Sequence, residues 1–351
     1  MVTRKVMHVL HDKMEKSCVK TVCVTGGAGY LASFLINRLL AKGYLVHATL
    51  RNLKDDSKVG LLKGLGNADT RLKLFEADIY NPCEFAAAVE GCQIVVHMAT
   101  PLQHYGNDSQ YKNTSEAAVG GVKSIVESCV RSNTVNKLIY TASVVASSPL
   151  KEQQEEEGGY NYKDFIDETC WTPLNTSYQM LTDYVRSKTL AEKEVLSYNG
   201  KNGIQVVSLA CGLVGGDTIQ SFMPESMATL ISQAINDGGR YRVLRGLEDL
   251  LAKVPIAHVE DVIDAHVFSM ETQHINGRFL CASHFLSSAQ IAALIQNCQP
   301  TITIKPELVE DVKRETSWGS RKLENLGFKY KYDAQKIIHD SLLCAKKLEI
   351  I

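Results

Sequence analysis

Several features that would point to a membrane or extracellular protein are missing from this sequence. No stretch reaches the roughly 18 continuous apolar residues expected of a membrane-spanning helix. Residues 1–20 carry charges of both signs and no long apolar run, so they predict a frayed N-terminal extension. We therefore expect a soluble, cytoplasmic protein.

Paired cysteines are missing as well. The ten cysteines form no Cys-x-x-Cys pair, and Cys23, Cys129 and Cys211 lie inside apolar patterns. This distribution is typical of buried thiols in a reducing compartment, and it favours neither a disulfide framework nor a zinc site. We expect no metal centre.

The chain also lacks an excess of charge of one sign. It has 38 basic and 39 acidic residues, a formal net charge of -1, and no basic stripe. This balance argues against a nucleic-acid partner and leaves a small molecule as the expected ligand. The sequence leaves open whether the protein is a monomer or a homodimer.

What the chain does contain is a regular alternation of strand and helix patterns, within 351 residues of which 45% are hydrophobic. Such alternation predicts an α/β fold of the Rossmann type, a doubly wound parallel sheet with helices on both faces. We expect a main domain over 21–212, to which later segments return, and a smaller lobe over 213–351. Predicted strands lie at 21–25, 44–50, 72–76, 93–97, 136–142 and 204–211, and predicted helices at 30–42, 84–90, 115–132 and 178–197.

A glycine-rich turn follows the first predicted strand. Gly26, Gly27 and Gly29 allow backbone with positive φ, and regularly spaced leucines after them predict a helix. The pattern Gly26-x-x-Gly29-x-x-Ala32 therefore stands where a dinucleotide pyrophosphate meets a helix N-terminus, with Ala32 as a small substitute for a third glycine. A structural loop without a ligand is the alternative, and the strand–turn–helix context argues against it.

The residues after the second predicted strand indicate which dinucleotide binds. NAD-binding chains carry an acidic residue about 20 positions beyond the glycines, and this chain has Arg51 there. A guanidinium attracts a 2′-phosphate, and Lys58, with Lys54 nearer, could add further positive charge. The alternative is that these cations are solvated loop residues. Asp78 ends the third strand and is suited to the adenine amine, although alone it is an ordinary turn residue. We therefore expect NADPH rather than NADH, and an NADP-binding domain over 21–212.

Tyr184 and Lys188 stand four positions apart in the predicted helix 178–197 and so share one face. An ammonium beneath the phenol would lower the pKa of Tyr184 from about 10 toward the range useful for acid and base chemistry. Ser143, at the end of a predicted strand, would supply a second hydroxyl for a carbonyl oxygen. A bare Tyr-x-x-x-Lys occurs by chance in many chains, so this interpretation depends on the glycine turn.

Apolar residues in 215–235 are spaced as on one helix face. Phe222, Met223, Met227 and Leu230 carry this spacing, which fits either ordinary core or a cavity. We predict that they line a substrate cavity over the strand ends, where open α/β sheets bind ligands, and that 213–351 is mainly a substrate-binding lobe.

Together these motifs resemble the extended short-chain dehydrogenase/reductase superfamily, and within it the plant dihydroflavonol reductase, anthocyanidin reductase and cinnamoyl-CoA reductase group. The resemblance runs from Thr21 to Ile351 and is carried by VTGGAGYLAS, HMATP, YVRSKTLAEKE, IAHVEDVIDAH and KLENLGFKYKY. The IAHVEDV segment and the length of the 215–255 insertion look most similar to anthocyanidin reductases.

The resemblance implies a role for individual residues. Ser143 would orient the carbonyl, Tyr184 would donate the proton, and Lys188 would hold the nicotinamide ribose. His97 would pack at a strand end rather than catalyse. Cofactor contacts would come from Gly26, Gly29, Tyr30, Leu31, Arg51, Lys58, Asp78, Ile79, Ala99, Thr100, Tyr184 and Lys188.

The chain departs from the family pattern at several positions. Ser148 stands where dihydroflavonol reductases have an asparagine that contacts substrate, and we expect it to contact substrate here. Gly120 replaces an Asn or Gln, and Ala210-Cys211-Gly212 stands where relatives have Pro-Thr near the nicotinamide. These departures leave the reductase chemistry in place and the substrate open.

We therefore expect an NADPH-dependent reductase of a carbonyl, or a conjugated equivalent, on a plant phenolic (flavonoid-like) or related specialised metabolite. One alternative is an NADP-dependent hydroxysteroid-type dehydrogenase or a sugar-nucleotide-modifying enzyme, because fold does not fix function. Another is a non-catalytic NADPH-binding protein. Arg51 argues against NAD-retaining epimerases, and the presence of Ser143, Tyr184 and Lys188 together argues against a silent protein.

Overall fold

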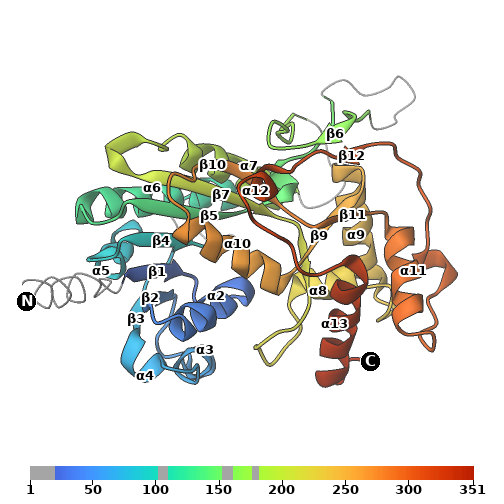
Figure 1. Ribbon diagram of the computed structural model, residues 1–351, viewed down its shortest axis with the longest axis horizontal. Coiled ribbons are helices and arrows are strands. Elements are labelled where there is room, and N and C mark those ends of the chain that lie inside the picture. The colour runs from blue at the N-terminus through green and yellow to red at the C-terminus, as the bar shows by residue number, and fades with distance from the viewer. Residues whose placement is uncertain (1–19, 102–109, 152–160, 176–181) are drawn as a thin grey trace, which may run out of the picture.

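A computed structural model describes residues 20–101, 110–151, 161–175 and 182–351 (Figure 1). The expected N-terminal extension lies almost wholly outside the described residues. Among the described residues, no helix has both the length and the apolar character needed to cross a bilayer.

Seven parallel strands form the central sheet, in the order β10-β7-β5-β4-β1-β2-β3 (Figure 1). Six of them match the predicted strands to within one residue, so the Rossmann-type fold class is confirmed. The seventh, β10, comes from the C-terminal part and pairs in parallel with β7. The strands are β1 (Thr21–Thr25), β2 (Leu45–Leu50), β3 (Leu72–Glu76), β4 (Ile94–His97), β5 (Lys137–Ser143), β7 (Gln205–Cys211) and β10 (Gly277–Cys281).

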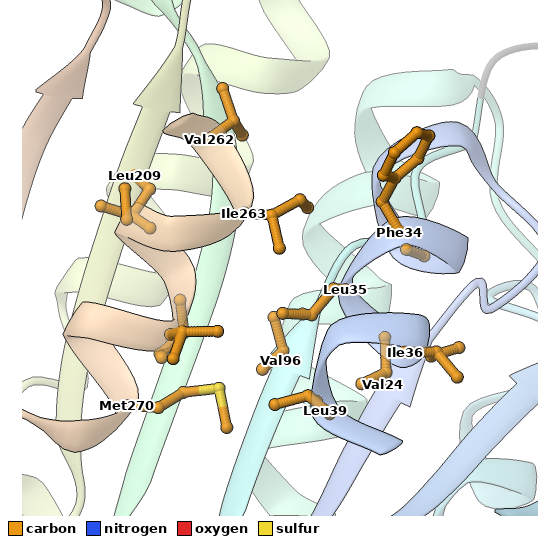
Figure 2. Close-up of a cluster of buried hydrophobic side chains, with 14 of the residues drawn as sticks. Val24, Phe34, Leu35, Ile36, Leu39, Val96, Leu209, Val262, Ile263 and Met270 are labelled. Atoms are coloured by element: carbon orange, nitrogen blue, oxygen red, sulfur yellow. The ribbon is translucent and has the colours of Figure 1, made fainter. Parts of the chain in front are cut away.

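Successive residues of each strand face opposite sides of the sheet, and both sides are buried. In β1, Val22 and Val24 belong to one apolar cluster and Cys23 to another. Helices α2 (Tyr30–Ala41) and α10 (Val259–Glu271) contribute to the first cluster. Figure 2 shows side chains of α2 and α10 together with Val24, Val96 and Leu209 of the strands in this cluster. This two-sided burial explains why the strands are continuous apolar runs.

The opposite side is covered by α6 (Thr114–Ser132) and α7 (Thr182–Leu196), which pack against each other along their length. Their buried residues join the second cluster with Cys23, Val95 and Leu138 of the strands. The short helix α5 (Ala86–Val89) also contributes to this cluster, whereas α3 (Asp56–Lys63) and α4 (Ala68–Arg71) contribute to the first.

The C-terminal part builds a second, three-stranded sheet over the carboxyl ends of the central strands. Its order is β11-β9-β8, with β8 (Leu213–Gly215), β9 (Val254–His258) and β11 (His284–Leu286). A third apolar cluster fills the space between this sheet and its helices, α8 (Glu225–Leu230), α9 (Gly238–Leu251), α11 (Ser288–Cys298) and α13 (Ala334–Lys347). Two short strands, β6 (Phe165–Ile166) and β12 (Ser317–Trp318), pair in parallel, and α12 (Lys322–Asn325) follows β12.

The chain passes from the central sheet to the second sheet at Gly212, between β7 and β8. A Cβ atom at Gly212 would lie 2.6 Å from the Pro255 carbonyl oxygen, closer than any real Cβ contact. Only glycine therefore lets the corner pack against β9. This is the physical reason for the glycine in the unusual Ala210-Cys211-Gly212 segment.

Candidate active site

The site forms where the carboxyl ends of parallel strands meet at one edge of the central sheet. Ser143 is the last residue of β5, and its backbone is in register with Cys211 of β7. Thr25 of β1 is in register with His97 of β4. The register brings together side chains that stand more than 180 residues apart in the sequence.

Helix α7 supplies the other two predicted catalytic residues. The helix begins at Thr182 with Asp183 in its first turn, and it has Lys193 in its last turn, charges that suit the two ends of a helix dipole. Tyr184 and Lys188 therefore lie one turn apart, on the face that meets β5. The Tyr184 phenol makes a side-chain hydrogen bond with Ser143.

The Lys188 ammonium lies deeper than the phenol. Its Nζ donates to the Thr100 hydroxyl at 2.9 Å and to the Thr141 carbonyl at 3.1 Å, and it lies 5.4 Å from the centre of the Tyr140 ring. Burial lowers the pKa of Lys188 to about 8, although Cys211 and Glu192 oppose this shift. The structure thus brings Ser143, Tyr184 and Lys188 together.

The pKa of Tyr184 differs from the sequence expectation. Burial raises it above 10, and this effect outweighs the lowering by the hydrogen bond with Ser143. The expected lowering by Lys188 is not found in this structure, in which its ammonium donates to Thr100 and Thr141. A raised pKa keeps the proton on the phenol at neutral pH, which suits an acid that donates it.

His97 is a packing residue in the structure. Its Nδ1 lies 2.9 Å from the Thr25 hydroxyl, and that oxygen accepts the N–H groups of Met98 and Ala99, each at 3.0 Å. Because both lone pairs of the hydroxyl are used, its single hydrogen goes to His97, whose Nδ1 must be unprotonated. Burial lowers the pKa of His97 to about 3. A neutral imidazole of this kind holds the end of β4 against β1.

A cleft of about 470 Å³ lies beside this group, over the glycine turn. Gly26 has a φ of 68°, and a Cβ there would lie 3.1 Å from the Ala99 Cα. Gly29 precedes α2 with no side-chain cap, so the first amides of that helix are open to an anion. The cleft is lined by Gly26, Gly29, Thr49, Arg51, Ala77, Asp78, Ile79, Tyr80, Met98, Ala99 and Thr100. This lining fits a dinucleotide with its pyrophosphate at the N-terminus of α2.

A second cavity, of about 310 Å³, opens on the other side of Tyr184. Most of its wall is apolar, and Glu225, Ser226 and Thr229 of α8 add polar groups. The described residues that line it are Ser143, Val144, Val145, Tyr184, Gly212, Leu213, Glu225, Ser226, Thr229, Val243, Leu247, Leu251, Val254 and Pro255. Both catalytic hydroxyls thus face a cavity suited to a small molecule with apolar rings.

The NAD dependent epimerase/dehydratase family matches residues 22–281, which is most of the chain. The chain belongs to this family. A putative anthocyanidin reductase from Ginkgo biloba is 32% identical over 92% of this chain and 93% of its own length. Noscapine synthase SDR1 from Papaver somniferum is 33% identical, with 93% of each chain covered.

A solved structure shares the whole architecture. Vestitone reductase from alfalfa (Medicago sativa L.) is 30% identical to this chain, with a TM-score of 0.77 over 94% of this chain and 99% of that one. The resemblance to extended short-chain dehydrogenases/reductases and to their plant reductase group is thereby confirmed. As a member of this epimerase/dehydratase family with reductases as relatives, the chain is an NAD(P)-dependent oxidoreductase.

Five of the residues that the family resemblance placed on the cofactor are not among the residues that line the cleft. Two of them, Tyr184 and Lys188, lie on α7, and Lys188 contacts the cleft residue Thr100. The Tyr30 hydroxyl donates to the Asp217 carbonyl at 3.0 Å, and Leu31 packs against the first apolar cluster. The Lys58 ammonium lies 2.6 Å from Asp55 in an exposed ion pair. Four lining residues were not predicted: Thr49, Ala77, Tyr80 and Met98. For Thr49, its position as a polar residue near the end of a predicted strand could have indicated a place in the cleft.

The three glycines of the turn have different roles, and only one needs positive φ. The turn has the positive φ that the glycines allow, and of the three only Gly26 lies in the left-handed region. A Cβ at Gly27 would lie 3.1 Å from the Cβ of Ala48, and one at Gly29 would lie 3.1 Å from the Gly26 carbonyl oxygen. Close packing, rather than backbone conformation, therefore requires glycine at these two positions.

Asp78 acts as a turn residue and also lines the cleft, as its position at the end of a predicted strand allowed. Its Oδ1 accepts the Tyr80 amide at 3.1 Å, as a turn residue does. A carboxylate has two oxygens with about four acceptor sites, so it retains capacity for a donor in the cleft that it lines.

The five residues predicted to contact substrate or to line its cavity lie elsewhere, since none is among the described residues that line the 310 Å³ cavity. Leu230 is fully buried in the third apolar cluster. Ser148 is buried and its hydroxyl donates to the Leu250 carbonyl, so it supports the end of α9. Met227 is fully buried, and Met223 packs against the third apolar cluster. Phe222 is 60% exposed. The opposite face of α8, with Ser226 and Thr229, lines the cavity instead.

Gly120 shows how this chain accommodates its departure from the family pattern. A Cβ atom at this position of α6 would lie 2.4 Å from the Tyr111 ring. The aromatic ring therefore occupies the space that a side chain at this position would take.

We expect Gly26→Ala to weaken NADPH binding at least tenfold, because the added Cβ displaces the Ala99 backbone that lines the cleft and strains a residue with positive φ. Isothermal titration measures the effect. Gly43→Ala is the matched control, since Gly43 has a φ of 85° and no atom within 4 Å of its Cβ position. Equal binding by the two variants would contradict the cofactor role of the turn.

Proposed function

We propose that this chain is an NADPH-dependent reductase of a carbonyl, or of a conjugated equivalent, on a plant phenolic (flavonoid-like) or related specialised metabolite, with Tyr184 as the proton donor. The observation that carries this proposal is that one face of α7 reaches both cavities, through Tyr184 at one and Lys188 at the other. The Tyr184 phenol lines the 310 Å³ cavity, and Lys188, one turn away, contacts Thr100 of the cofactor cleft.

The geometry supports a separate role for each of Ser143, Tyr184 and Lys188. Bound NADPH would supply the hydride. The hydroxyls of Ser143 and Tyr184, which contact each other and line the cavity, can both bind one carbonyl oxygen. Tyr184 holds its proton at neutral pH and can deliver it to that oxygen as negative charge develops. The Lys188 cation donates to Thr100, a residue of the cleft, and is thereby placed to bind a ribose hydroxyl.

The preference for NADPH over NADH depends on Arg51. This residue lines the cleft directly after β2, where an NAD-specific chain has a carboxylate. A carboxylate would repel a 2′-phosphate, whereas a guanidinium binds it with charge-assisted hydrogen bonds. Lys58 is engaged with Asp55, so we assign the phosphate to Arg51 alone.

The cavity narrows the class of substrate. Its wall is formed largely by aliphatic side chains of α9 and the second sheet, such as Val243, Leu247 and Leu251. Such a wall suits a ring-bearing molecule and argues against the sugar-nucleotide alternative, because sugars need many hydrogen-bonding partners. The relatives are named for anthocyanidin, noscapine and vestitone, so we assign the class rather than a single substrate.

We place this activity in the cytoplasm of a plant cell. The described cysteines are free, and most are buried within the strands and helices, as expected of a protein kept in a reducing compartment. We also propose that 21–212 form an NADP-binding domain and that 213–351 form a mainly substrate-binding lobe. Strand β10 of the later segment adds to the sheet of the NADP-binding domain.

The decisive variant is Tyr184→Phe, which removes one oxygen and keeps the ring. NADPH consumption is measured over a panel of flavonoid, phenylpropanoid, alkaloid, terpenoid and steroid ketones, with identification of the products. We expect kcat on the best substrate to fall by roughly 10²–10⁴ while NADPH still binds. Tyr198→Phe is the control, because its hydroxyl contacts only Glu194 among the described partners at the far end of α7. Near-normal turnover by Tyr184→Phe would refute the assigned proton donor, and a steroid as the sole substrate would favour the hydroxysteroid alternative.

Cofactor preference has its own test in Arg51→Ala. We expect the wild-type chain to bind NADPH more tightly than NADH, because a charge-assisted contact contributes on the order of 1.5–3 kcal/mol. The variant should lose affinity for NADPH by about 10–100-fold and keep its affinity for NADH. Titration of both cofactors decides the matter, and an unchanged ratio of affinities would show that Arg51 does not contact the phosphate.

Activity should also depend on pH through Lys188. The ammonium is present below its pKa of about 8 and is lost as pH rises through that value. We therefore expect kcat/KM to fall above about pH 8. In Lys188→Arg the guanidinium stays charged, so any residual activity should show no such fall. If the wild-type profile stays flat to pH 10, the charge on Lys188 is not required.

A further inference from the structure

Arg278 is a nearly fully buried cation on β10, and it lines neither the cofactor cleft nor the substrate cavity. Its side chain is 6% exposed and pairs with Glu192, which is 0% exposed. A charge removed from water is costly unless its hydrogen-bonding groups find partners. The partners of the guanidinium therefore show what this residue holds together.

One side of the guanidinium binds helix α7. Nε lies 3.0 Å from Glu192 Oε1, and Nη2 lies 3.1 Å from Oε2, so the contact is bidentate. Glu192 also accepts the Ser208 hydroxyl of β7 at 2.7 Å. Because Glu192 follows Lys188 by four residues and Tyr184 by eight, all three lie along one face of α7. The contact thus fixes this face of the helix against the central sheet.

The other side binds the turn that follows the catalytic serine. Nη2 lies 2.6 Å from the Ser147 hydroxyl and 3.1 Å from the Ala146 carbonyl. These residues close the short 3-10 helix Val144–Ala146, whose Val145 amide donates to the Ser143 hydroxyl. One guanidinium therefore contacts both elements that carry the catalytic hydroxyls.

The remaining contacts of Arg278 depend on the flat, forked guanidinium as well as on its charge. Nη1 donates to the carbonyls of Glu168, at 3.1 Å, and Cys170. The Cζ atom of the guanidinium lies over the Trp171 ring, 3.7 Å from its centre. A lysine in this place would keep the charge but lose the bidentate contact and the stacking.

We propose that Arg278 is a positioning residue for the catalytic group, which holds helix α7 against the Ser143 turn and so fixes the approach of the Tyr184 phenol to the Ser143 hydroxyl. The inference rests on the proposed reductase function. Arg278 acts from β10, about 90 residues beyond Tyr184 in the sequence, through Glu192 on one side and through Ala146 and Ser147 on the other.

The test is Arg278→Lys in the full chain. Misplacement of a reacting group by about 1 Å costs up to 10²-fold in rate, so we expect kcat to fall 10–100-fold. The substrate KM and the NADPH Kd should change less than about threefold, because Arg278 lines neither cavity. Hydrogen exchange should accelerate in peptides covering 143–148 and 184–192. The melting temperature should fall as well.

Arg38→Lys is the matched control. Arg38 also forms ion pairs between two elements, joining α2 to Glu260 and Asp264 of α10, on the other side of the sheet from α7. We expect this variant to lower the melting temperature without changing kcat or the exchange of 143–148 and 184–192. A fall in kcat that merely follows the loss of stability in both variants would overturn the positioning role.

A milder variant covers the case in which Arg278→Lys does not fold. Ser147→Ala removes only one contact between the guanidinium and the turn, and we expect it to lower kcat at least threefold at unchanged KM. Wild-type kcat in Ser147→Ala, or in a folded Arg278→Lys, overturns the inference. If the wild-type chain and Tyr184→Phe are equally inactive on every substrate, the proposed function has failed, and the exchange comparison still decides whether Arg278 holds the two segments together.

Discussion

The buried ammonium of Lys188 joins the cofactor cleft to the elements that carry Ser143 and Tyr184. A cation this deep is tolerated only because the Thr100 hydroxyl and the Thr141 carbonyl accept its protons. Thr100 belongs to the cofactor cleft, Thr141 to the strand that ends in Ser143, and Lys188 itself to the helix that carries Tyr184. The same bonds that satisfy the charge therefore align the cleft, the strand and the helix.

Burial also sets the protonation of this group. It raises the pKa of Tyr184 and lowers that of Lys188, each toward the neutral form. The phenol consequently keeps its proton at neutral pH, while the lysine remains mostly charged. Buried His97 and His266 are kept neutral, with pKa values lowered to about 3 and about 4, so neither competes as a proton donor.

The sequence predicts the parts of this protein in which local pattern and tertiary structure agree. Six apolar runs became strands of the central sheet because both faces of that sheet are buried, and the Gly26 turn lies at the cleft as its spacing predicts. β10 was not predicted, because a five-residue strand has no local signal that assigns it to a partner 70 residues earlier. Its Arg278 was missed for the same reason, since the contacts with Glu192 and Ser147 exist only after the sheet has formed.

The substrate side is where spacing alone misleads. Helical spacing cannot tell which face of α8 meets the cavity and which meets the core, so Met227 was assigned to the wrong one, and Thr229 was not considered. The expectations for Ser148 and Gly120 came from the residues that relatives have at these positions. In this structure a backbone carbonyl of α9 and the Tyr111 ring, respectively, determine their environment.

The place of β10 at the end of the central sheet has a consequence for how the protein is made. Until residue 281 has been synthesised, β7 is an unpaired apolar edge, a surface prone to pair with other chains. Because a ribosome makes the N-terminal part first, the nascent chain must carry that edge while roughly seventy more residues emerge. A shortened chain ending near residue 212 would keep the nucleotide turn, Tyr184 and Lys188, yet it would remain an aggregation-prone intermediate rather than a minimal enzyme.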